Sequence, residues 1–190
     1  WDEAANWNPD GIPGSNDTVI FNTVATVDMP FNTTVRYVTV EGTGNVTLTG
    51  GGTLTVSNDL TVGGTLSTGA NAITIDGTTT GGGTWTAGTG TVTVGGDFGA
   101  TAFSQVGGTL LLNGTTAAFD PGGPLSSLEL GAGADVTLSD DITLNGNLTV
   151  GGTFSTGTNA ITIDGTTTCA GYWTAGARHV SASGTHSSAS

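Results

Sequence analysis

The chain has 190 residues, of which 34 are glycine and 39 are threonine, and its formal net charge at pH 7 is −13. Its 15 acidic residues stand against two arginines, so the clustered cations that bind nucleic acid or an anionic membrane surface are missing. Because the chain has no lysine, P-loop and Schiff-base chemistry are excluded as well.

The first 30 residues predict an N-terminal cap followed by the first strands. Trp1 and Trp7 are expected to cover the open end of a stack of strands, because such an end exposes unpaired backbone groups. No run of about 18 apolar residues occurs, which predicts no insertion into a membrane. No basic and apolar leader opens the sequence, so we expect an exported chain, extracellular or at the cell surface, whose signal peptide has been removed.

Short triplets of the form apolar–threonine–apolar run along the rest of the chain and predict strands. Successive side chains of a strand point to opposite faces, so each triplet places two apolar groups inward and one threonine outward. Gly-Gly, Asn-Gly and Asp-Gly pairs between the triplets are typical of turns, and helix signals are nearly absent. The predicted strands cover residues 38–40, 46–48, 54–56, 60–62, 73–75, 92–94, 136–138, 142–144, 148–150 and 161–163.

A long internal repeat decides between the all-β folds that such short strands allow. Residues 60–80 are identical to residues 148–168 at 19 of 21 positions, at an offset of 88 residues. Clusters of triplets recur at roughly 19–22 residues, which is about the circumference of a coil of three short strands. A stack of coils explains such a repeat, because each coil meets the same neighbours above and below.

We therefore predict an all-β fold, a right-handed parallel β-helix (β-solenoid) of about nine short three-strand rungs. The solenoid is expected to form a single domain over residues 1–190. Its predicted parts are the cap and first strands in 1–30, a first long repeat in 35–120, a partial second repeat in 125–176 and a divergent tail in 177–190.

Two stretches of the sequence resemble a known class of proteins. Trp1, Asn6-Trp7, Gly11, Pro13, Asp17, Val19 and Phe21 look like the opening of many bacterial secreted β-helix modules. The sequence GTWTAGTGTVTV at 83–94, followed by residues 125–130, resembles repeats of autotransporter-like and filamentous-haemagglutinin-like adhesins. The resemblance implies a right-handed parallel β-helix, export, and a structural or adhesive role, and it transfers no catalytic residue.

Acidic residues near turns are the candidates for a metal site. Asp59, Asp140, Asp141 and Asp17 lie where a calcium ion could gather several oxygen ligands. No Asp-x-Asp-x-Asp loop or Gly-Gly-x-Gly-x-Asp nonapeptide occurs, and aspartate also forms turns without any metal. The turn role is therefore the leading interpretation, and no cofactor is expected.

No constellation in the sequence predicts an enzyme. β-Helix hydrolases need paired carboxylates at a defined separation, whereas Asp140 and Asp141 are adjacent and would point to opposite faces of a strand. Cys169 and His179 could form a thiol–imidazole pair, but Cys169 replaces Gly81 of the first copy at the start of the divergent tail.

Outward threonines and a few aromatic residues are the remaining candidates for binding. Regular Thr-x-Thr arrays on a flat face can order water and bind ice, although threonine is also a common residue on exposed strands. Trp85 and its repeat equivalent Trp173 are expected to pack in the core, and a role in stacking on glycans is the alternative. The threonine pairs of this form are Thr47/Thr49, Thr53/Thr55 and Thr91/Thr93.

These features predict a non-enzymatic extracellular structural protein, a subunit or segment of a cell-surface fibre. It would assemble by end-to-end stacking, because uncapped solenoid ends are pairing edges, so its main partner would be another copy of itself. Trp1, Trp7 and Trp173 are the candidate capping or assembly residues. One alternative is an adhesin stalk that displays a binding region elsewhere, and another is an ice- or glycan-binding solenoid.

Overall fold

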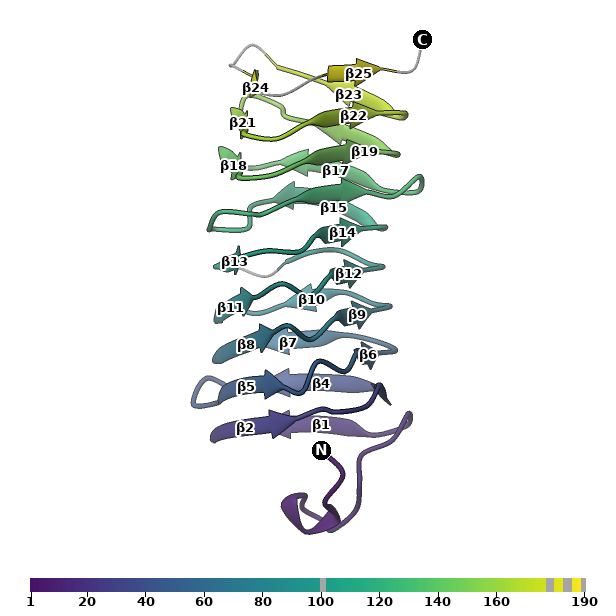
Figure 1. Ribbon diagram of the computed structural model, residues 1–190, viewed down its shortest axis with the longest axis vertical. Coiled ribbons are helices and arrows are strands. Elements are labelled where there is room, and N and C mark those ends of the chain that lie inside the picture. The colour runs from purple at the N-terminus through teal and green to yellow at the C-terminus, as the bar shows by residue number, and fades with distance from the viewer. Residues whose placement is uncertain (100–101, 177–179, 183–185, 189–190) are drawn as a thin grey trace.

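The computed structural model describes residues 1–99, 102–176, 180–182 and 186–188, with side chains up to residue 176. It is an all-β solenoid in which the chain winds in flat coils stacked along one axis (Figure 1). The strands of neighbouring coils pair in parallel, and each predicted triplet forms a strand or part of one. The only helix in the described residues is the short 3₁₀ turn η1 (Ala4–Asn6).

One face of the solenoid is a continuous nine-stranded sheet, called here the long sheet, which takes one strand from each coil. The nine coils make about eight full turns, and successive strands of the long sheet are 18–21 residues apart. The coils are numbered one to nine by these strands: β3 (Thr33–Val35), β6 (Leu54–Val56), β9 (Ile73–Ile75), β12 (Val92–Val94), β14 (Leu110–Leu112), β16 (Leu128–Leu130), β19 (Leu148–Val150), β22 (Thr167–Cys169) and β25 (His186–Ser188).

The other two faces are each divided into two sheets. The first face consists of β1 (Thr18–Phe21), β4 (Tyr37–Val40), β7 (Leu60–Val62) and β10 (Thr79–Thr80), and then of β15 (Thr115–Phe119), β17 (Asp135–Leu138), β20 (Thr153–Ser155) and β23 (Tyr172–Thr174). The second face consists of β2 (Val24–Asp28), β5 (Asn45–Thr49), β8 (Thr65–Gly69), β11 (Thr84–Ala87) and β13 (Phe103–Gln105), and then of β18 (Ile142–Leu144), β21 (Ile161–Ile163) and β24 (Val180–Ala182).

The core is a column of inward side chains from all three faces. In most of the three-residue strands the outer two residues are buried and the central one faces out, as the triplets predict. Aliphatic residues fill most of the column, but coils four to six contain an aromatic cluster of Trp85, Phe98, Phe103 and Phe119. The ring centroid of Phe103 lies 5.0 Å from that of Trp85 and 5.3 Å from that of Phe98.

The two copies of the long repeat lie on different faces of the solenoid. An offset of 88 residues is four coils of about 19 residues plus about 12 more, or about two thirds of a coil. Residues 60–62 therefore form β7 on the first face, whereas the matching residues 148–150 form β19 in the long sheet. Likewise, residues 73–75 lie in the long sheet and residues 161–163 on the second face.

No helix in the described residues is long and apolar enough to span a membrane.

Candidate functional site

Asp59, a predicted calcium candidate, accepts hydrogen bonds across two neighbouring coils. Its Oδ1 accepts the backbone N–H of Thr78 at 2.8 Å and the hydroxyl of the same residue at 3.1 Å. The repeat equivalents are Asn147 and Thr166, where Oδ1 of Asn147 accepts the same two bonds at 2.9 and 3.0 Å. Because a neutral amide makes the same contacts as the carboxylate, this position joins coils without needing a negative charge.

We expect the variants Asp59→Asn and Asp59→Ala to behave differently. Asparagine keeps the acceptor oxygen, so the free energy of unfolding should change by less than about 0.5 kcal/mol, whereas alanine leaves the Thr78 N–H unpaired and should cost about 1–2 kcal/mol. Urea denaturation of both variants measures the difference. Equal losses in the two variants, together with a wild-type melting temperature that rises with added calcium, would show instead that the carboxylate holds a metal ion.

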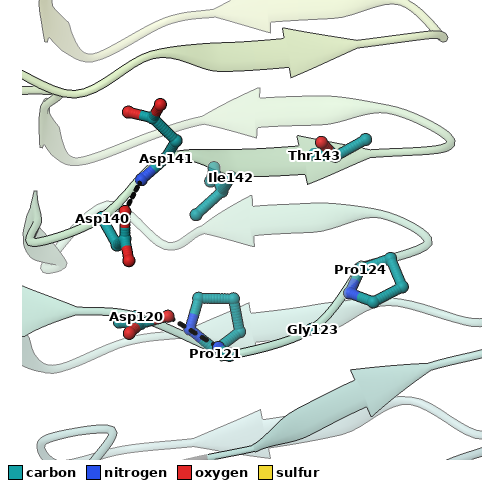
Figure 2. Close-up of a pocket in the computed structure, with 9 residues that line it drawn as sticks. Asp120, Pro121, Gly123, Pro124, Asp140, Asp141, Ile142 and Thr143 are labelled. Carbon is teal, nitrogen blue, oxygen red and sulfur yellow. Dashed lines mark hydrogen bonds between the residues drawn. The ribbon is translucent and has the colours of Figure 1, made fainter.

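Asp140 and Asp141 line a pocket in the wall of the solenoid, together with Asp120 (Figure 2). The pocket has a volume of about 300 Å³ and lies between residues 120–124 of coil six and residues 140–143 of coil seven. Both aspartates belong to the turn between β17 and β18 and not to a strand. Their carboxylates nevertheless point in opposite directions, with that of Asp140 toward the segment of Asp120 and that of Asp141 away from it.

Each of these three carboxylates already accepts a backbone hydrogen bond. Asp120 accepts from Gly122 and Asp140 from Asp141, both at 2.7 Å, which is the usual way in which aspartate stabilises a turn. Asp141 accepts from the N–H of Ala160 in the next coil at 2.7 Å. Among the described residues, no three His, Cys, Asp or Glu side chains come together in a way that could hold a metal ion.

The outward hydroxyls form columns that run along the rod. Thr34, Thr55, Thr74 and Thr93 are in register on the long sheet, and the column then meets Leu111 and Glu129. On the second face the column is Thr26, Thr47, Ser67, Thr86 and Ser104. Each column spans four or five coils and so covers about half of the rod.

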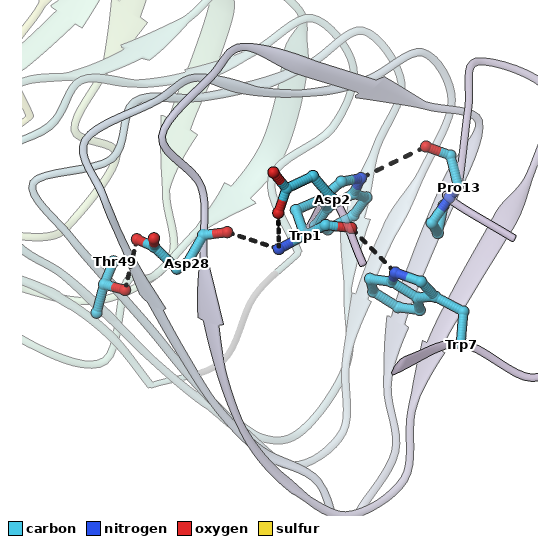
Figure 3. Close-up of polar contacts among 6 residues, drawn as sticks. All are labelled: Trp1, Asp2, Trp7, Pro13, Asp28 and Thr49. Atoms are coloured by element: carbon cyan, nitrogen blue, oxygen red, sulfur yellow. Dashed lines mark hydrogen bonds and ion pairs between the residues drawn. The ribbon is translucent and has the colours of Figure 1, made fainter. Parts of the chain in front are cut away.

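The N-terminal residues fold against the first coil (Figure 3). The ring centroids of Trp1 and Trp7 are 5.0 Å apart, and that of Trp7 is 5.9 Å from Phe21 of β1. The Trp7 indole N–H donates to the carbonyl of Trp1 at 3.1 Å, and the terminal ammonium of Trp1 donates to the carbonyl of Asp28 at 2.7 Å. The side chain of Trp1 is 5% exposed, so this segment lies over the apolar column of the first coil.

Trp173 lies in coil nine, half-buried, with its ring centroid 5.9 Å from that of Phe154. Its indole N–H has no hydrogen-bond partner in the structure. The equivalent Trp85 is fully buried, because coil five covers it. Cys169 is a free, half-buried thiol, whereas its predicted partner His179 and most of the divergent tail lie outside the described residues.

The sequence analysis missed the segment of residues 120–124 that lines the pocket. Its sequence, DPGGP, lacks the apolar–threonine–apolar pattern, and its two prolines cannot donate the hydrogen bonds of a strand. That combination is a sequence signal for a gap in the wall.

Comparisons of the chain with protein-family models, with curated proteins and with solved structures find no match.

Proposed function

We propose that this chain is a non-enzymatic structural element of an exported protein, a rigid solenoid rod at the cell surface or outside the cell. The observation that carries the proposal is the placement of the repeat. Nearly identical segments face different directions, since residues 60–62 lie on the first face and residues 148–150 in the long sheet. A sequence kept for one binding surface would be expected to repeat on one face.

The residues shared by the two copies are those that join coils. Asn71 donates from Nδ2 to the carbonyl of Gly52 in the coil before it at 2.9 Å, and its equivalent Asn159 donates to the carbonyl of Leu138 at 2.9 Å. Asp59 and Asn147 bond across coils in the same way. The repeated features therefore serve the stacking of coils, which is what a rod needs whichever face they occupy.

A stalk that carries a binding region elsewhere is the form of this role that the geometry favours. The packing of Trp1 and Trp7 against Phe21 supports a capping role, because a coil stacked onto the N-terminal end would have to displace both indoles. Fibre assembly by end-to-end stacking is the second candidate. It is supported at the other end by Tyr172, which is 79% exposed, and by the half-buried Trp173 beside it.

Binding of ice or of surface glycans is a third candidate, supported by the two hydroxyl columns. Both columns carry uncharged groups at the strand spacing of about 4.8 Å. The leucine and the glutamate that follow on the long sheet limit its regular part to four coils.

The proposal predicts that the purified chain stays monomeric up to high protein concentration and binds neither ice nor glycans. Sedimentation and electron microscopy test for assembly, while thermal hysteresis and a glycan array test for binding. Antibody labelling of intact producing cells is expected to give a surface signal.

The alternative outcomes separate the three candidates. Filaments with an axial repeat near the length of the solenoid would replace the stalk by the fibre. Thermal hysteresis or saturable glycan binding would replace both by a binding protein. Antibody signal found only after the cells are lysed would contradict export.

A further inference from the structure

The walls of the solenoid are interrupted on two of the three faces at the same level. On the first face, the ladder from β1 to β10 ends in a single bridge between Thr79 and Phe98. Between coils five and six, the backbone N–H of Phe98 then donates to the side-chain hydroxyl of Thr116 at 3.1 Å instead of to a strand.

On the second face, residues 120–125 of coil six occupy the place between β13 and β18 without forming a strand. They contact the two strands through isolated bridges, Phe103 with Gly122 and Leu125 with Leu144. The pocket of about 300 Å³ lies where this segment leaves β18. Of the three faces, only the long sheet therefore carries a full strand pair between coils five and six, that of β14 with β16.

Two further features weaken the contact between these coils. Gln105 is 3% exposed, and neither atom of its side-chain amide has a hydrogen-bond partner, a costly arrangement in a core. Ala102 has a φ of +68°, in the left-handed region that costs a residue with a Cβ about 1 kcal/mol. Against these features stands the contact between Phe98 and Phe119, whose ring centroids are 5.6 Å apart.

We propose that the rod consists of two cooperative units joined by a weak contact between coils five and six. In a stack of coils, stability is the sum of the coils and of the contacts between neighbours, so cooperativity breaks first at the weakest contact. The N-terminal unit is coils one to five, and the C-terminal unit is coils six to nine. The first long repeat, 35–120, ends at this junction.

The C-terminal unit is expected to unfold first. It has four coils instead of five, and most of the aromatic cluster, Trp85, Phe98 and Phe103, belongs to the other unit. The tryptophans report separately on the two units, because Trp173 lies in the C-terminal unit and Trp85 in the N-terminal one.

The test uses two full-length variants with one tryptophan each, both carrying Trp1→Phe and Trp7→Phe. The first also carries Trp85→Phe and the second Trp173→Phe. We expect the fluorescence of Trp173 to change at a lower urea concentration than that of Trp85. Coincident transitions in the two variants would overturn the proposal.

Hydrogen exchange of the unsubstituted chain gives a second measurement that no substitution can disturb. The backbone amides of coils seven and eight should exchange together and at least tenfold faster than those of coils two to four. One common exchange rate for both groups would overturn the proposal in the same way.

Discussion

Replacing Phe103 by alanine is expected to lower the free energy of unfolding by about 3–5 kcal/mol. The side chain is fully buried in coil five, and its ring makes edge-on contacts with both Trp85 and Phe98. Coils above and below are tied to their neighbours by backbone ladders, so they cannot collapse into the space that the ring leaves. Urea denaturation followed by the fluorescence of Trp85 measures the loss.

Phe31→Ala is the matched control for this prediction. Phe31 is 69% exposed in the turn between β2 and β3, so its removal should change stability by less than about 0.5 kcal/mol. Similar effects of the two substitutions would contradict the assignment of the core.

Gly83→Ala is expected to destabilise the chain by about 2–3 kcal/mol, although it adds a single methyl group. Gly83 lies at the corner between the first and second faces, directly above Gly64, and a Cβ on Gly83 would overlap the carbonyl oxygen of Gly64. That oxygen already accepts the N–H of Thr84 at 2.8 Å, so it cannot move without breaking the contact between coils. The same arrangement recurs in the second copy, where Gly171 lies above Gly152.

The adjacent residue provides the control, since a Cβ on Gly82 would meet no atom within 4 Å. Gly82→Ala should therefore leave stability within about 0.5 kcal/mol of the wild type. Thermal melting of both variants under identical conditions compares them. A loss at Gly82 as large as that at Gly83 would mean that the corner needs glycine for flexibility rather than for close packing.

Much of this fold follows from the sequence, because each coil is built from local signals. Triplets such as 54–56 and 92–94 form strands with the expected side chains inward, and the nine coils agree with the predicted number. The predicted coil length of 19–22 residues is close to the observed 18–21. Periodicity succeeds here since the neighbours of a strand are other strands of the same kind.

The rotation of the repeat was missed although the sequence contained it. An offset of 88 residues is not a whole number of 19-residue coils, so the copies could not share a face. The interruption near residues 98–125 is harder to foresee, because it depends on how Phe98 and residues 120–125 replace strands with single bridges. Pro121 and Pro124 mark the gap, but they do not show that the first face is interrupted at the same level.

The candidate sites were less predictable than the fold. The sequence placed Asp140 and Asp141 near a turn, but not the pocket that they share with Asp120, because those residues come from different coils. The role of Asp59 became clear only when its bonds to Thr78 were compared with those of Asn147 to Thr166. Contacts between coils depend on register, which composition does not reveal.

Small-angle X-ray scattering of the purified chain over a concentration series tests the central claim, a rigid monomeric rod, most directly. Salt of about 0.15 M screens the repulsion between chains that carry a net charge of −13. The account predicts a monomer mass at every concentration and a skewed pair-distance distribution, as expected for nine coils at about 4.8 Å each, a rod of about 43 Å. A symmetric distribution typical of a compact globule, or a mass that grows with concentration, would contradict it.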